Sequence, residues 1–395
     1  MSTRPRVKVL ELRSVAGTGG GPEKTILNGA ARSDPRSVAV TVCYIRDRRD
    51  DVFAIREHAH ALGVDYVEVL EDHSFDWRVF GQLRALVRER QIDIVHAHEY
   101  KTDLLALLLA RFERVIPLST AHGWTGNSSR ELLMYYPLDK RLLARYPRVI
   151  AVSTEIKQEL VKHGARPERV DVVLNGIDHT RFRRLRDRRA AAREALGFSD
   201  TDFVIGTVGR VERQKRFDIL LDAIAPIARQ NSTVRVVIAG DGSLRRAIET
   251  HAAGLGLTSI CSFLGHRTDV AQLHSAFDLF VLSSDYEGTP NSVLEAMACE
   301  TPIVATAAGG TAELARHGQE ALIVAPGDTN GLRAAIAECL QRGEDVQARV
   351  QAARQRILTE LSFEVRMARV ERIYSEIVGA RNAQDMAPRP QEFVG

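Results

Sequence analysis

The stretch that decides the fold runs from residue 278 to residue 310 and reads DLFVLSSDYEGTPNSVLEAMACETPIVATAAGG. Its first six residues, Asp278 to Ser283, form a short apolar run, which is typical of a buried parallel strand. A polar loop leads to Pro290, which suits the first turn of a helix, where a missing N–H costs nothing. The helix is predicted from Asn291 to Cys299, and the next buried strand from Thr301 to Thr306. This order of strand, loop, helix and strand predicts an α/β domain with a parallel sheet.

Two carboxylates frame this loop and helix. Glu287 lies in the loop at the carboxyl end of the strand, and Glu295 lies in the helix, with seven residues between them. Ligands of open α/β sheets bind outside the carboxyl ends of the strands, and a helix N-terminus offers unpaired N–H groups to an anion. The pattern therefore favours a loop that holds a diphosphate with a Glu on either side, as a sugar nucleotide would need. On spacing alone, the alternative is a helix-start Glu and a solvated surface Glu.

The segment EGTPNSVLEAMACETPIVAT, followed by Gly309 and Gly310, resembles the signature of retaining glycosyltransferases of family 4, which have the two-domain GT-B fold. In that family the first Glu approaches the transferred sugar, and the second holds the ribose of the nucleotide. The resemblance therefore implies a catalytic role for Glu287 and a donor-binding role for Glu295. It also implies donor contacts from the residues that open the helix: Gly288, Thr289, Pro290 and Asn291.

Composition and length describe an ordinary globular protein of two or three domains. The chain has 395 residues, of which 45% are hydrophobic and 27% are charged. No run approaches the ~20 apolar residues of a membrane span, and the N-terminus has no apolar stretch long enough for a signal peptide. The four cysteines are scattered without a CxxC spacing, which implies neither a metal site nor a disulfide framework. We therefore expect a cytoplasmic protein.

The net charge of +3 is unevenly distributed along the chain. Residues 181–193, RFRRLRDRRAAAR, contain seven Arg and one Asp, whereas residues 194–395 are net acidic. Such a joint favours an anionic acceptor or an anionic membrane surface, with a solvated helix face as the alternative. Residues 127–148 have the composition of a basic amphipathic helix, which either lies on the inner face of a membrane or flanks an acceptor site. We expect no nucleic-acid partner.

Glycines follow the first predicted strand. They do not complete a GxGxxG fingerprint, because Pro22 stands three residues after Gly19, and this weakens a dinucleotide-cofactor interpretation. A plain strand–helix turn is one alternative. The sequence GGGPEK is also similar to the GG-x-E-[RK] turn of family 4, which closes over the diphosphate and sugar from the N-terminal domain. The matching donor-binding positions are Gly19, Gly20 and Gly21.

Histidines mark the ends of two further strands. One strand ends in His96 and His98, and with Glu99 these offer a metal interpretation that lacks another ligand at useful spacing. His98 is alternatively a residue that lines the cleft between domains. The strand at residues 116–120 leads to His122, which on spacing alone is a loop residue that caps a strand. The H-x-H and T-x-H-G patterns resemble family 4, in which this His reaches the transferred sugar, and the resemblance gives His122 a catalytic role.

The second α/β unit is predicted to begin at Phe203. Its first strand leads to Arg210, and Lys215 precedes the next helix. Arg binds a diphosphate through a planar fork and Lys as a point charge, although two solvated surface cations fit the spacing equally well. GR-x4-K followed by FD-x-LL resembles the phosphate pair of the family, which implies that Arg210 and Lys215 hold the diphosphate. His266 and Arg267 match a family loop that lies against the nucleotide base.

The resemblance covers nearly the whole chain and implies a GT-B protein with two Rossmann-like doubly wound parallel-sheet domains that face each other across a cleft. We expect an acceptor-side domain at residues 1–180, an Arg-rich linker at 181–200 and a nucleotide-sugar domain at 201–362. A crossover helix at 363–379 and a disordered tail at 380–395 are expected to follow.

The reaction that the resemblance implies is transfer of a sugar, with retention, from a nucleotide-diphosphate sugar to a hydroxyl acceptor. We favour a UDP-sugar over a GDP-sugar as the donor. The expected acceptor is a glycan or lipid-linked glycan in the synthesis of cell-surface polysaccharide, and neither a cofactor nor a metal is expected. The rival hypotheses are a glucan phosphorylase or synthase, a non-catalytic sugar-nucleotide sensor and a dinucleotide-dependent oxidoreductase.

Overall fold

The computed structural model describes residues 6–17, 19–74, 76–124 and 131–386, and the chain divides into two compact units. Unit 1 comprises Met1–Val173 and Phe363–Gly395, and unit 2 comprises Leu174–Ser362. The Arg-rich stretch that we expected to be a linker therefore lies inside unit 2. The reason is electrostatic, because Arg189 and Arg193 form ion pairs with the carboxylate of Asp278 in unit 2.

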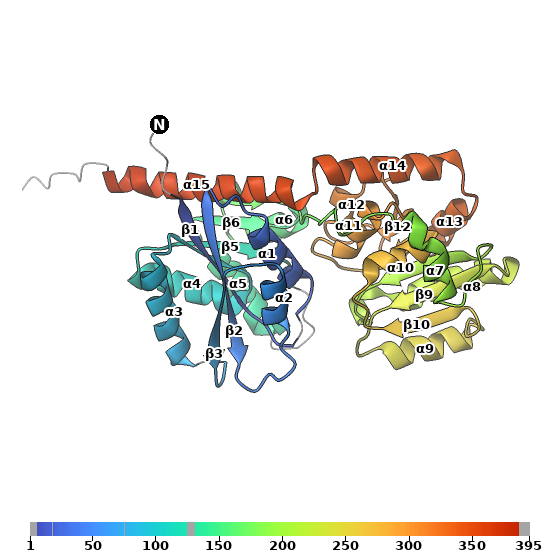
Figure 1. Cartoon of the computed structure of the whole chain (residues 1–395), viewed down its shortest axis with the longest axis horizontal. Coiled ribbons are helices and arrows are strands. Elements are labelled where there is room, and N and C mark those ends of the chain that lie inside the picture. The colour runs from blue at the N-terminus through green and yellow to red at the C-terminus, as the bar shows by residue number, and fades with distance from the viewer. Residues whose placement is uncertain (1–5, 18, 75, 125–130, 387–395) are drawn as a thin grey trace, which may run out of the picture. The chain divides into compact units, whose positions relative to one another are not determined.

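Within the described residues, unit 1 holds a seven-stranded parallel sheet in the order β3-β2-β1-β4-β5-β6-β7 (Figure 1). Its strands are β1 (Val7–Ser14), β2 (Val38–Asp47), β3 (Tyr66–Glu71), β4 (Ile94–Ala97), β5 (Ile116–Ala121), β6 (Arg148–Ala151) and β7 (Val170–Val172). Its α-helices are α1 (Gly21–Ala31), α2 (Ile55–Ala61), α3 (Trp77–Arg90), α4 (Tyr100–Phe112), α5 (Tyr136–Leu143), α6 (Thr154–Lys162) and α15 (Phe363–Met386). This strand order is that of a doubly wound sheet, which extends outward from β1 in both directions.

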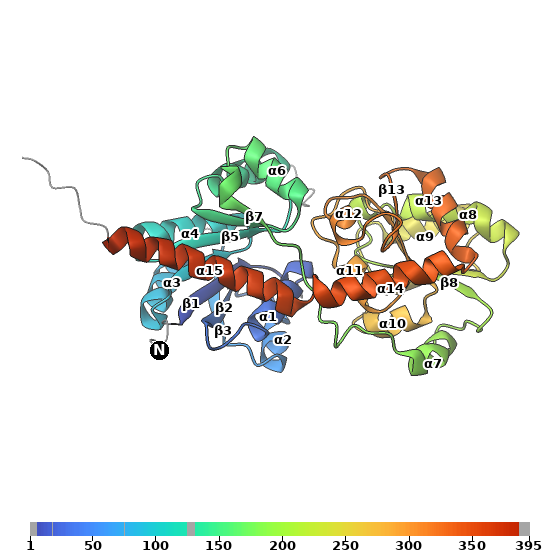
Figure 2. The same cartoon turned by 90° about the horizontal axis from the view of Figure 1, so that it is seen from above.

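Alternate residues of the unit 1 strands face two helical layers, because side chains of a strand point to opposite faces in turn. Leu10 of β1 and Val95 of β4 pack in one core with helices α3 to α6. Val9 and Ile94 face the other way and pack against Val370 of α15. Figure 2 shows α15 lying along this sheet. The C-terminal helix is therefore part of the unit 1 core.

The tail expected from residue 380 onward is partly helical. Helix α15 continues to Met386, because Arg381 donates a hydrogen bond to the carbonyl of Arg114 at 2.8 Å and lies 3.5 Å from a carboxylate oxygen of Asp93. Residues 380–386 are therefore described as helix, which differs from the expected disorder. The remainder of the predicted tail lies outside the described residues.

Unit 2 holds, within the described residues, a six-stranded parallel sheet in the order β10-β9-β8-β11-β12-β13. Its strands are β8 (Phe203–Val208), β9 (Val234–Ala239), β10 (Cys261–Gly265), β11 (Leu279–Leu282), β12 (Ile303–Thr306) and β13 (Leu322–Val324). Its α-helices are α7 (Arg189–Glu194), α8 (Phe217–Gln230), α9 (Arg245–Gly254), α10 (Val270–Ala276), α11 (Asn291–Ala298), α12 (Thr311–Leu314), α13 (Thr329–Leu340) and α14 (Glu344–Thr359). The expectation of two doubly wound parallel sheets is confirmed.

The segment from residue 278 to residue 310 folds as predicted. It forms β11, the loop, α11 and β12 in that order, and both strands are buried throughout. Leu294 and Met297 of α11 pack in a core with Ala353 and Ile357 of α14. Helices α8, α9 and α13 cover the opposite face of the sheet. The segment therefore forms the centre of unit 2, and its loops lie at the carboxyl edge of the sheet.

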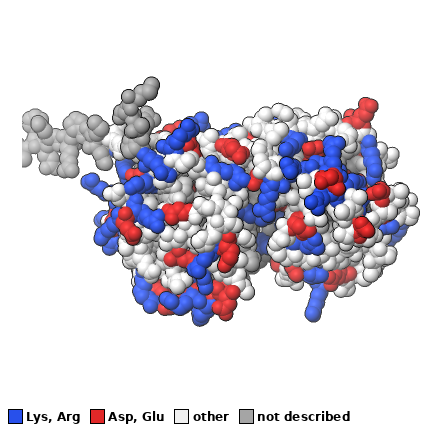
Figure 3. All heavy atoms as spheres, in the orientation of Figure 1, with Lys and Arg blue, Asp and Glu red and all other residues white. Residues whose placement is uncertain are grey.

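The segment expected to form a basic amphipathic helix at residues 127–148 is described from residue 131 onward. A π-helical turn at Glu131–Tyr135 leads into α5. Among the described residues, no helix is both long enough and apolar enough to cross a membrane. On the face shown in Figure 3, acidic and basic side chains are interspersed.

Candidate active site

Lys215 and Glu287, to which the resemblance gave separate roles, are in direct contact. Lys215 lies in the loop after β8 and Glu287 in the loop after β11, and these two strands are parallel neighbours. The Lys215 ammonium lies 2.5 Å from Oε1 of Glu287, and the two side chains are only 12% and 9% exposed. Water therefore screens this ion pair less than it would screen a pair on the surface. Glu287 is therefore a buried, paired carboxylate.

Buried hydroxyl groups hold this pair in place. Ser284 donates a hydrogen bond from Oγ to Oε1 of Glu287 at 2.6 Å. Ser283 donates to the carbonyl of Lys215 at 2.8 Å, and Thr306 donates to the carbonyl of Ser284 at 2.6 Å. The ammonium and the carboxylate are thus fixed by the ends of three neighbouring strands, β8, β11 and β12.

A glycine lets the loop after β12 approach the backbone that carries Glu287. Gly309 has φ +54°, and a Cβ at this position would collide with the carbonyl oxygen of Glu287. The N–H of Gly310 donates to the carbonyl of Gly288 at 2.8 Å. The pair of glycines at the end of the quoted sequence therefore has a structural role beside the candidate site.

Substitution of Gly309 by alanine is expected to lower the free energy of unfolding by about 3 kcal/mol, because the added Cβ must displace the Glu287 loop. Gly318 is the matched control, since it also has a positive φ (+73°) but would place its Cβ with nothing within 4 Å. Gly318→Ala should therefore cost only about 1 kcal/mol, from backbone strain. Urea unfolding of both variants measures the difference, and equal losses would contradict the account.

The residues after Glu287 open helix α11 at the same edge of the sheet. Gly288, Thr289 and Pro290 are buried, and Asn291 accepts a hydrogen bond from Nδ2 of the buried Asn175 at 3.3 Å. The helix begins at Asn291, and a helix N-terminus is a common place for an anion to bind. Asn175 opens an Asn-Gly-Ile-Asp run that is similar to a family motif, although the sequence alone assigned Asn175 no role at the site.

Glu295 lies within α11 and is only 3% exposed. Its burial excludes the alternative of a solvated surface Glu. Nothing in the geometry assigns it a ligand, so the ribose role stays a prediction from the resemblance. The two glutamates nevertheless lie on one short segment, with Glu287 in the loop and Glu295 in the helix that this loop opens.

Arg210 follows β8 at the same edge, and its side chain is exposed. The surrounding loops are tied together by their backbones, since the N–H of Gly209 donates to the carbonyl of Ala239 at 3.0 Å and the N–H of Gly240 donates to the carbonyl of Gly265 at 2.8 Å. The loops after β8, β9 and β10 thus form one frame. Arg210 is held on this frame, and its diphosphate role stays a prediction.

His266 and Arg267 follow β10, which lies two strands from β8 in the sheet. Both side chains are exposed, and the Arg267 guanidinium pairs with Asp269 at 2.6 Å. Neighbouring strands are about 4.8 Å apart, so the end of β10 lies roughly 10 Å from the end of β8. The two residues therefore lie beside the phosphate-site candidates rather than among them, and their base-side role stays a prediction.

In unit 1, His122 belongs to a chain of hydrogen bonds. Its Nε2 lies 3.0 Å from Nδ1 of His98, and Nε2 of His98 is hydrogen-bonded to the Glu11 carboxylate. Glu11 on β1 and His96 on β4 are directly paired in the sheet register, which brings the carboxylate to the histidines. His98 is buried, so its part is to hold His122 from within unit 1.

The protonation states along this chain follow from burial and charge. Burial alone would raise the pKa of the Glu11 carboxyl, but His96 and His98 hold that pKa well below its usual value. Burial lowers the pKa of His98 to about 4 and that of His122 well below its usual value. A neutral His98 donates to Glu11 and accepts from Nε2–H of His122, an assignment made from the hydrogen-bond pattern. His122 then presents Nδ1 as an acceptor, which suits a hydroxyl group.

A second branch joins the histidines to the C-terminal helix. Nδ1 of His96 lies 2.8 Å from the hydroxyl of Tyr374, Nε2 lies 2.7 Å from the hydroxyl of Thr120, and Tyr374 donates to Glu11 at 2.8 Å. Sequence analysis missed Glu11 and Tyr374. A charged residue in the middle of the buried first strand was the signal for Glu11, whereas the place of Tyr374 depends on how α15 packs.

The residues of the metal interpretation are arranged differently from the expectation. Glu99 caps α4 by accepting from the N–H groups of Lys101 and Thr102. The third side chain near His96 and His98 is instead that of Glu11. Each ring nitrogen of the two histidines already has a hydrogen-bond partner in the described chain, so the arrangement favours a hydrogen-bonded network.

The glycine turn at residues 19–21 leads into α1 and is connected to the histidines. The N–H of Gly20 donates to Glu23 at 2.5 Å, and Glu23 pairs with Arg13. Arg13 also donates to the carbonyl of His98 at 2.8 Å. The Glu of the GGGPEK sequence therefore stabilises the turn, and the turn shares Arg13 with the histidine chain.

Buried histidines should make stability depend on pH. The lowered pKa of His98, about 4, lies below the value of about 6.5 in an unfolded chain, so His98 binds a proton on unfolding. The contribution of His98 to the free energy of unfolding is complete above pH ~6.5 and falls by about 1.4 kcal/mol per pH unit as the pH drops toward 4.

Asp103 and Asp139 have the opposite effect on stability, because burial raises their pKa values and the folded state then gains stability as the pH falls. The measurement is therefore the difference in urea stability between the wild type and His98→Gln from pH 7 to pH 5, which should shrink as the pH falls. A difference that stays constant between pH 7 and pH 5 would contradict the predicted contribution of His98.

Two family models match the chain. "Glycosyltransferase Family 4" matches residues 19–181, and "Glycosyl transferases group 1" matches residues 202–342. The first match begins at the glycine turn and includes His96, His98 and His122. The second match includes Lys215 and Glu287. The two matches thus fall one on each sheet.

Individual proteins support the same assignment. The protein EpsD of Bacillus subtilis (strain 168) is 30% identical over 276 residues, which are 67% of this chain and 72% of EpsD. The D-inositol 3-phosphate glycosyltransferase of Geodermatophilus obscurus is 30% identical over 365 residues, which are 84% of this chain and 80% of that protein. The crystal structure of Anabaena HepE in complex with UDP and glucose has a TM-score of 0.82 at 22% identity, and the match covers 94% of this chain and 100% of HepE. This likeness confirms the expected fold class.

Proposed function

The chain belongs to glycosyltransferase family 4, and we propose that it moves a sugar from a UDP-sugar to a hydroxyl of a glycan or lipid-linked glycan, with retention. The observation that carries the proposal is the buried pair of Lys215 and Glu287 at the carboxyl edge of the unit 2 sheet. Lys215 and Arg210 hold the diphosphate, and Glu295 holds the ribose. Glu287 and His122 contact the transferred sugar. Because the chain belongs to this family, the rival hypothesis of a dinucleotide-dependent oxidoreductase is not supported.

The pairing of Lys215 with Glu287 suits a donor in which the sugar is attached to the diphosphate. An ammonium has three N–H donors, and one of them serves Glu287. The other two are available to phosphate oxygens, so one side chain can lie between the phosphates and the carboxylate that contacts the sugar. As the C–O bond to the diphosphate breaks, negative charge grows on the leaving phosphate, and Lys215 and Arg210 stabilise it. The leaving phosphate then takes the proton of the attacking hydroxyl on the same face of the sugar.

The preference for uridine rests on HepE, whose crystal structure contains UDP and glucose. His266 and Arg267 at the end of β10 are our candidates for contact with the base. The glycine turn and the neutral acceptor nitrogen of His122 are the contributions of unit 1, toward the diphosphate and a sugar hydroxyl respectively. The acceptor class is proposed from the resemblance.

The experiment is an assay of the purified chain with UDP-, GDP- and ADP-sugars, in which release of the nucleoside diphosphate is measured. We expect release from a UDP-sugar, faster when a hydroxyl acceptor is present. The anomeric configuration of the product, read by NMR, should match that of the donor. If the nucleoside diphosphate were released only from GDP- or ADP-sugars, the proposed donor base would be wrong. A glucan product would favour the synthase hypothesis. Tight binding of a nucleotide sugar without any turnover would favour the sensor and overturn the proposal.

We also propose that unit 1 contacts an anionic membrane at the inner face of the cell, where a lipid-linked acceptor would lie. Leu133, Met134 and Leu138 are more than half exposed on the π-helical turn and α5, and Arg141 and Arg145 near them are exposed. Exposed apolar and basic side chains together suit an anionic interface. Sedimentation with phosphatidylglycerol vesicles should be lost in Leu133→Glu. Equal sedimentation of the variant would contradict the contact.

A further inference from the structure

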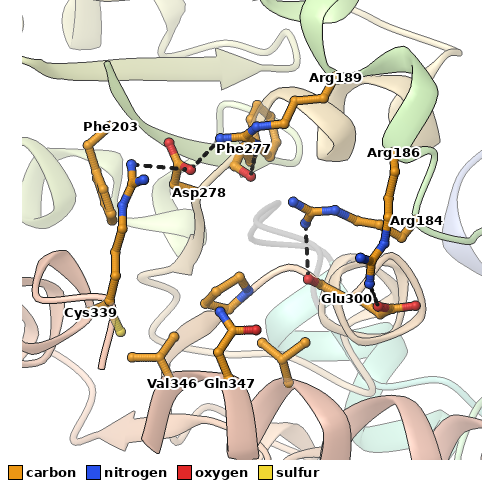
Figure 4. A pocket seen from close by; sticks show the side chains of 13 residues that line it. Arg184, Arg186, Arg189, Phe203, Phe277, Asp278, Glu300, Cys339, Val346 and Gln347 are labelled. Atoms are coloured by element: carbon orange, nitrogen blue, oxygen red, sulfur yellow. Dashed lines mark hydrogen bonds and ion pairs between the residues drawn. The ribbon is translucent and has the colours of Figure 1, made fainter. Parts of the chain in front are cut away.

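A pocket of about 420 Å3 lies in unit 2 at the opposite end of the sheet from the donor loops (Figure 4). Its lining includes the starts of three strands, since Phe203 begins β8, Asp278 precedes β11 and Pro302 precedes β12. The loops with Lys215 and Glu287 follow the other ends of these strands. A strand advances about 3.3 Å per residue, so even the shortest of them separates the two places by roughly 10 Å or more. The pocket is therefore distinct from the donor site.

The lining of this pocket carries an excess of positive charge. Four of its residues are arginines: Arg184, Arg186, Arg189 and Arg342. Three of them come from the Arg-rich stretch at residues 181–193, to which the donor site gives no role. The carboxylates in the lining are those of Asp278 and Glu300. Four positive charges against two negative charges leave a surplus of two.

The carboxylate of Asp278 is shared by several cations. It lies 2.6 Å from Arg189 and 3.5 Å from Arg342, and it also pairs with Arg193, whose side chain is buried. A single negative charge cannot neutralise three guanidinium groups. The charge excess at this end of the sheet is therefore larger when the buried Arg193 is counted with the lining.

Arg184 and Arg186 are the cations with the weakest existing partners. Within the described residues Arg184 forms no ion pair, and its guanidinium donates to the carbonyl of Glu300 at 3.1 Å. Burial and the neighbouring Arg189 lower the pKa of Arg184, which is the effect of a half-buried cation beside another cation. Arg186 lies 3.6 Å from the Glu300 carboxylate, and its side chain is 85% exposed. Both groups can turn to an incoming anion.

The pocket also has apolar lining residues. Phe203, Phe277 and Val346 line it, and the Arg342 guanidinium lies 5.3 Å from the centroid of the Phe203 ring. In Figure 4, Val346 rises into the pocket from α14, while Arg184 enters from the opposite side. A ligand that fits this pocket has an anionic end and an apolar end.

We propose that this pocket binds a phosphate monoester that carries an apolar group, either in a soluble metabolite or in a lipid headgroup. The phosphate accepts hydrogen bonds from Arg184 and Arg186, whose planar forks suit phosphate oxygens, and the apolar group packs against Phe203 and Val346. A phosphate monoester carries about −1.5 to −2 charges at pH 7, which matches the surplus of two. The volume of the pocket lies within the range of roughly 300–1,000 Å3 that is usual for ligand pockets.

Isothermal titration of the full chain with phenyl phosphate tests the proposal. We expect saturable binding that weakens about tenfold or more in Arg184→Gln and in Arg186→Gln, because each change removes hydrogen bonds to a charged group. Arg186 is highly exposed, so its variant should fold even if Arg184→Gln is destabilised, and circular dichroism checks both. Arg333→Gln is the matched control, since Arg333 is an exposed arginine of unit 2 outside the pocket lining. This control should bind like the wild type.

Two further measurements locate the site and the source of the phosphate. Arg210→Gln should leave phenyl phosphate binding unchanged, because Arg210 lies at the donor edge of the sheet. In the Leu133→Glu background, which removes the proposed unit 1 contact, sedimentation with phosphatidic acid vesicles but not phosphatidylcholine vesicles, lost when Arg186→Gln is added, would identify a lipid headgroup. Binding of phenyl phosphate without such sedimentation would identify a soluble ligand. The proposal would be overturned by the absence of binding heat, by wild-type affinity in both pocket variants, or by loss of binding only in Arg210→Gln.

Discussion

Substitution of Glu287 by glutamine is expected to lower kcat about 100- to 10,000-fold while UDP binds as tightly as before or more tightly. The change removes the carboxylate that we place against the transferred sugar, and charge placed at a reacting centre contributes on this scale. Glutamine keeps the size of the side chain and can still accept from Ser284. The Lys215 ammonium also loses its carboxylate partner, and its full charge then acts on the diphosphate. Steady-state kinetics and UDP calorimetry on the same preparation measure both effects.

The matched control for this variant is Asp285→Asn. Asp285 lies in the same loop, but its side chain is 43% exposed and pairs with Arg216 at 2.8 Å. This variant should keep kcat within a few-fold, because exposed ion pairs contribute only about 0–1 kcal/mol. If Glu287→Gln lost UDP affinity and kcat together, or if both variants behaved alike, Glu287 would be a structural residue of the loop.

Substitution of Lys215 by methionine is expected to weaken UDP binding about 100-fold or more and to lower kcat as well. The variant removes the cation that we assign to the diphosphate. It also leaves the buried Glu287 carboxylate without its ammonium, so that a negative charge remains beside the phosphates. UDP calorimetry and donor turnover measure the loss.

Two other variants separate these causes. Arg213→Gln changes an exposed cation in the same turn and should leave UDP affinity within a few-fold of the wild type. The double variant Lys215→Met with Glu287→Gln should bind UDP more tightly than Lys215→Met alone, because it removes the uncompensated carboxylate. A double-mutant cycle quantifies this coupling. A simple sum of the two single effects would contradict the direct contact of the two side chains.

The main elements of both sheets could be predicted from the sequence because buried parallel strands appear as short apolar runs between helical segments. Strand β11 and helix α11 are examples, because none of their predicted ends differs from the structure by more than one residue. Long-range charge contacts were harder to predict. The sequence predicted that the Arg-rich stretch is a linker or a solvated helix face. Arg189 and Arg193 instead pair with Asp278, and the stretch lies inside unit 2.

The individual site residues were accessible from motifs, but their contacts were not. Lys215 and Glu287 are 72 residues apart, and their contact depends on the adjacency of β8 and β11, which sequence spacing does not specify. The partner of His98 is Glu11, which depends on the register of β1 against β4. Tyr374 joins the same cluster only because α15 packs on the unit 1 sheet. Motifs identify residue types, whereas strand order and register decide which residues meet.

In the proposed donor site, unit 2 binds a nucleoside diphosphate through the cations that follow β8, Arg210 and Lys215. The most direct measurement is isothermal titration of UDP into the wild-type chain and into the double variant Arg210→Gln with Lys215→Met. We predict saturable binding at one site in the wild type and a loss of about 100-fold or more in the variant. Equal affinity in the two proteins would contradict the claim, as would the absence of binding heat with uridine, guanosine and adenosine diphosphates.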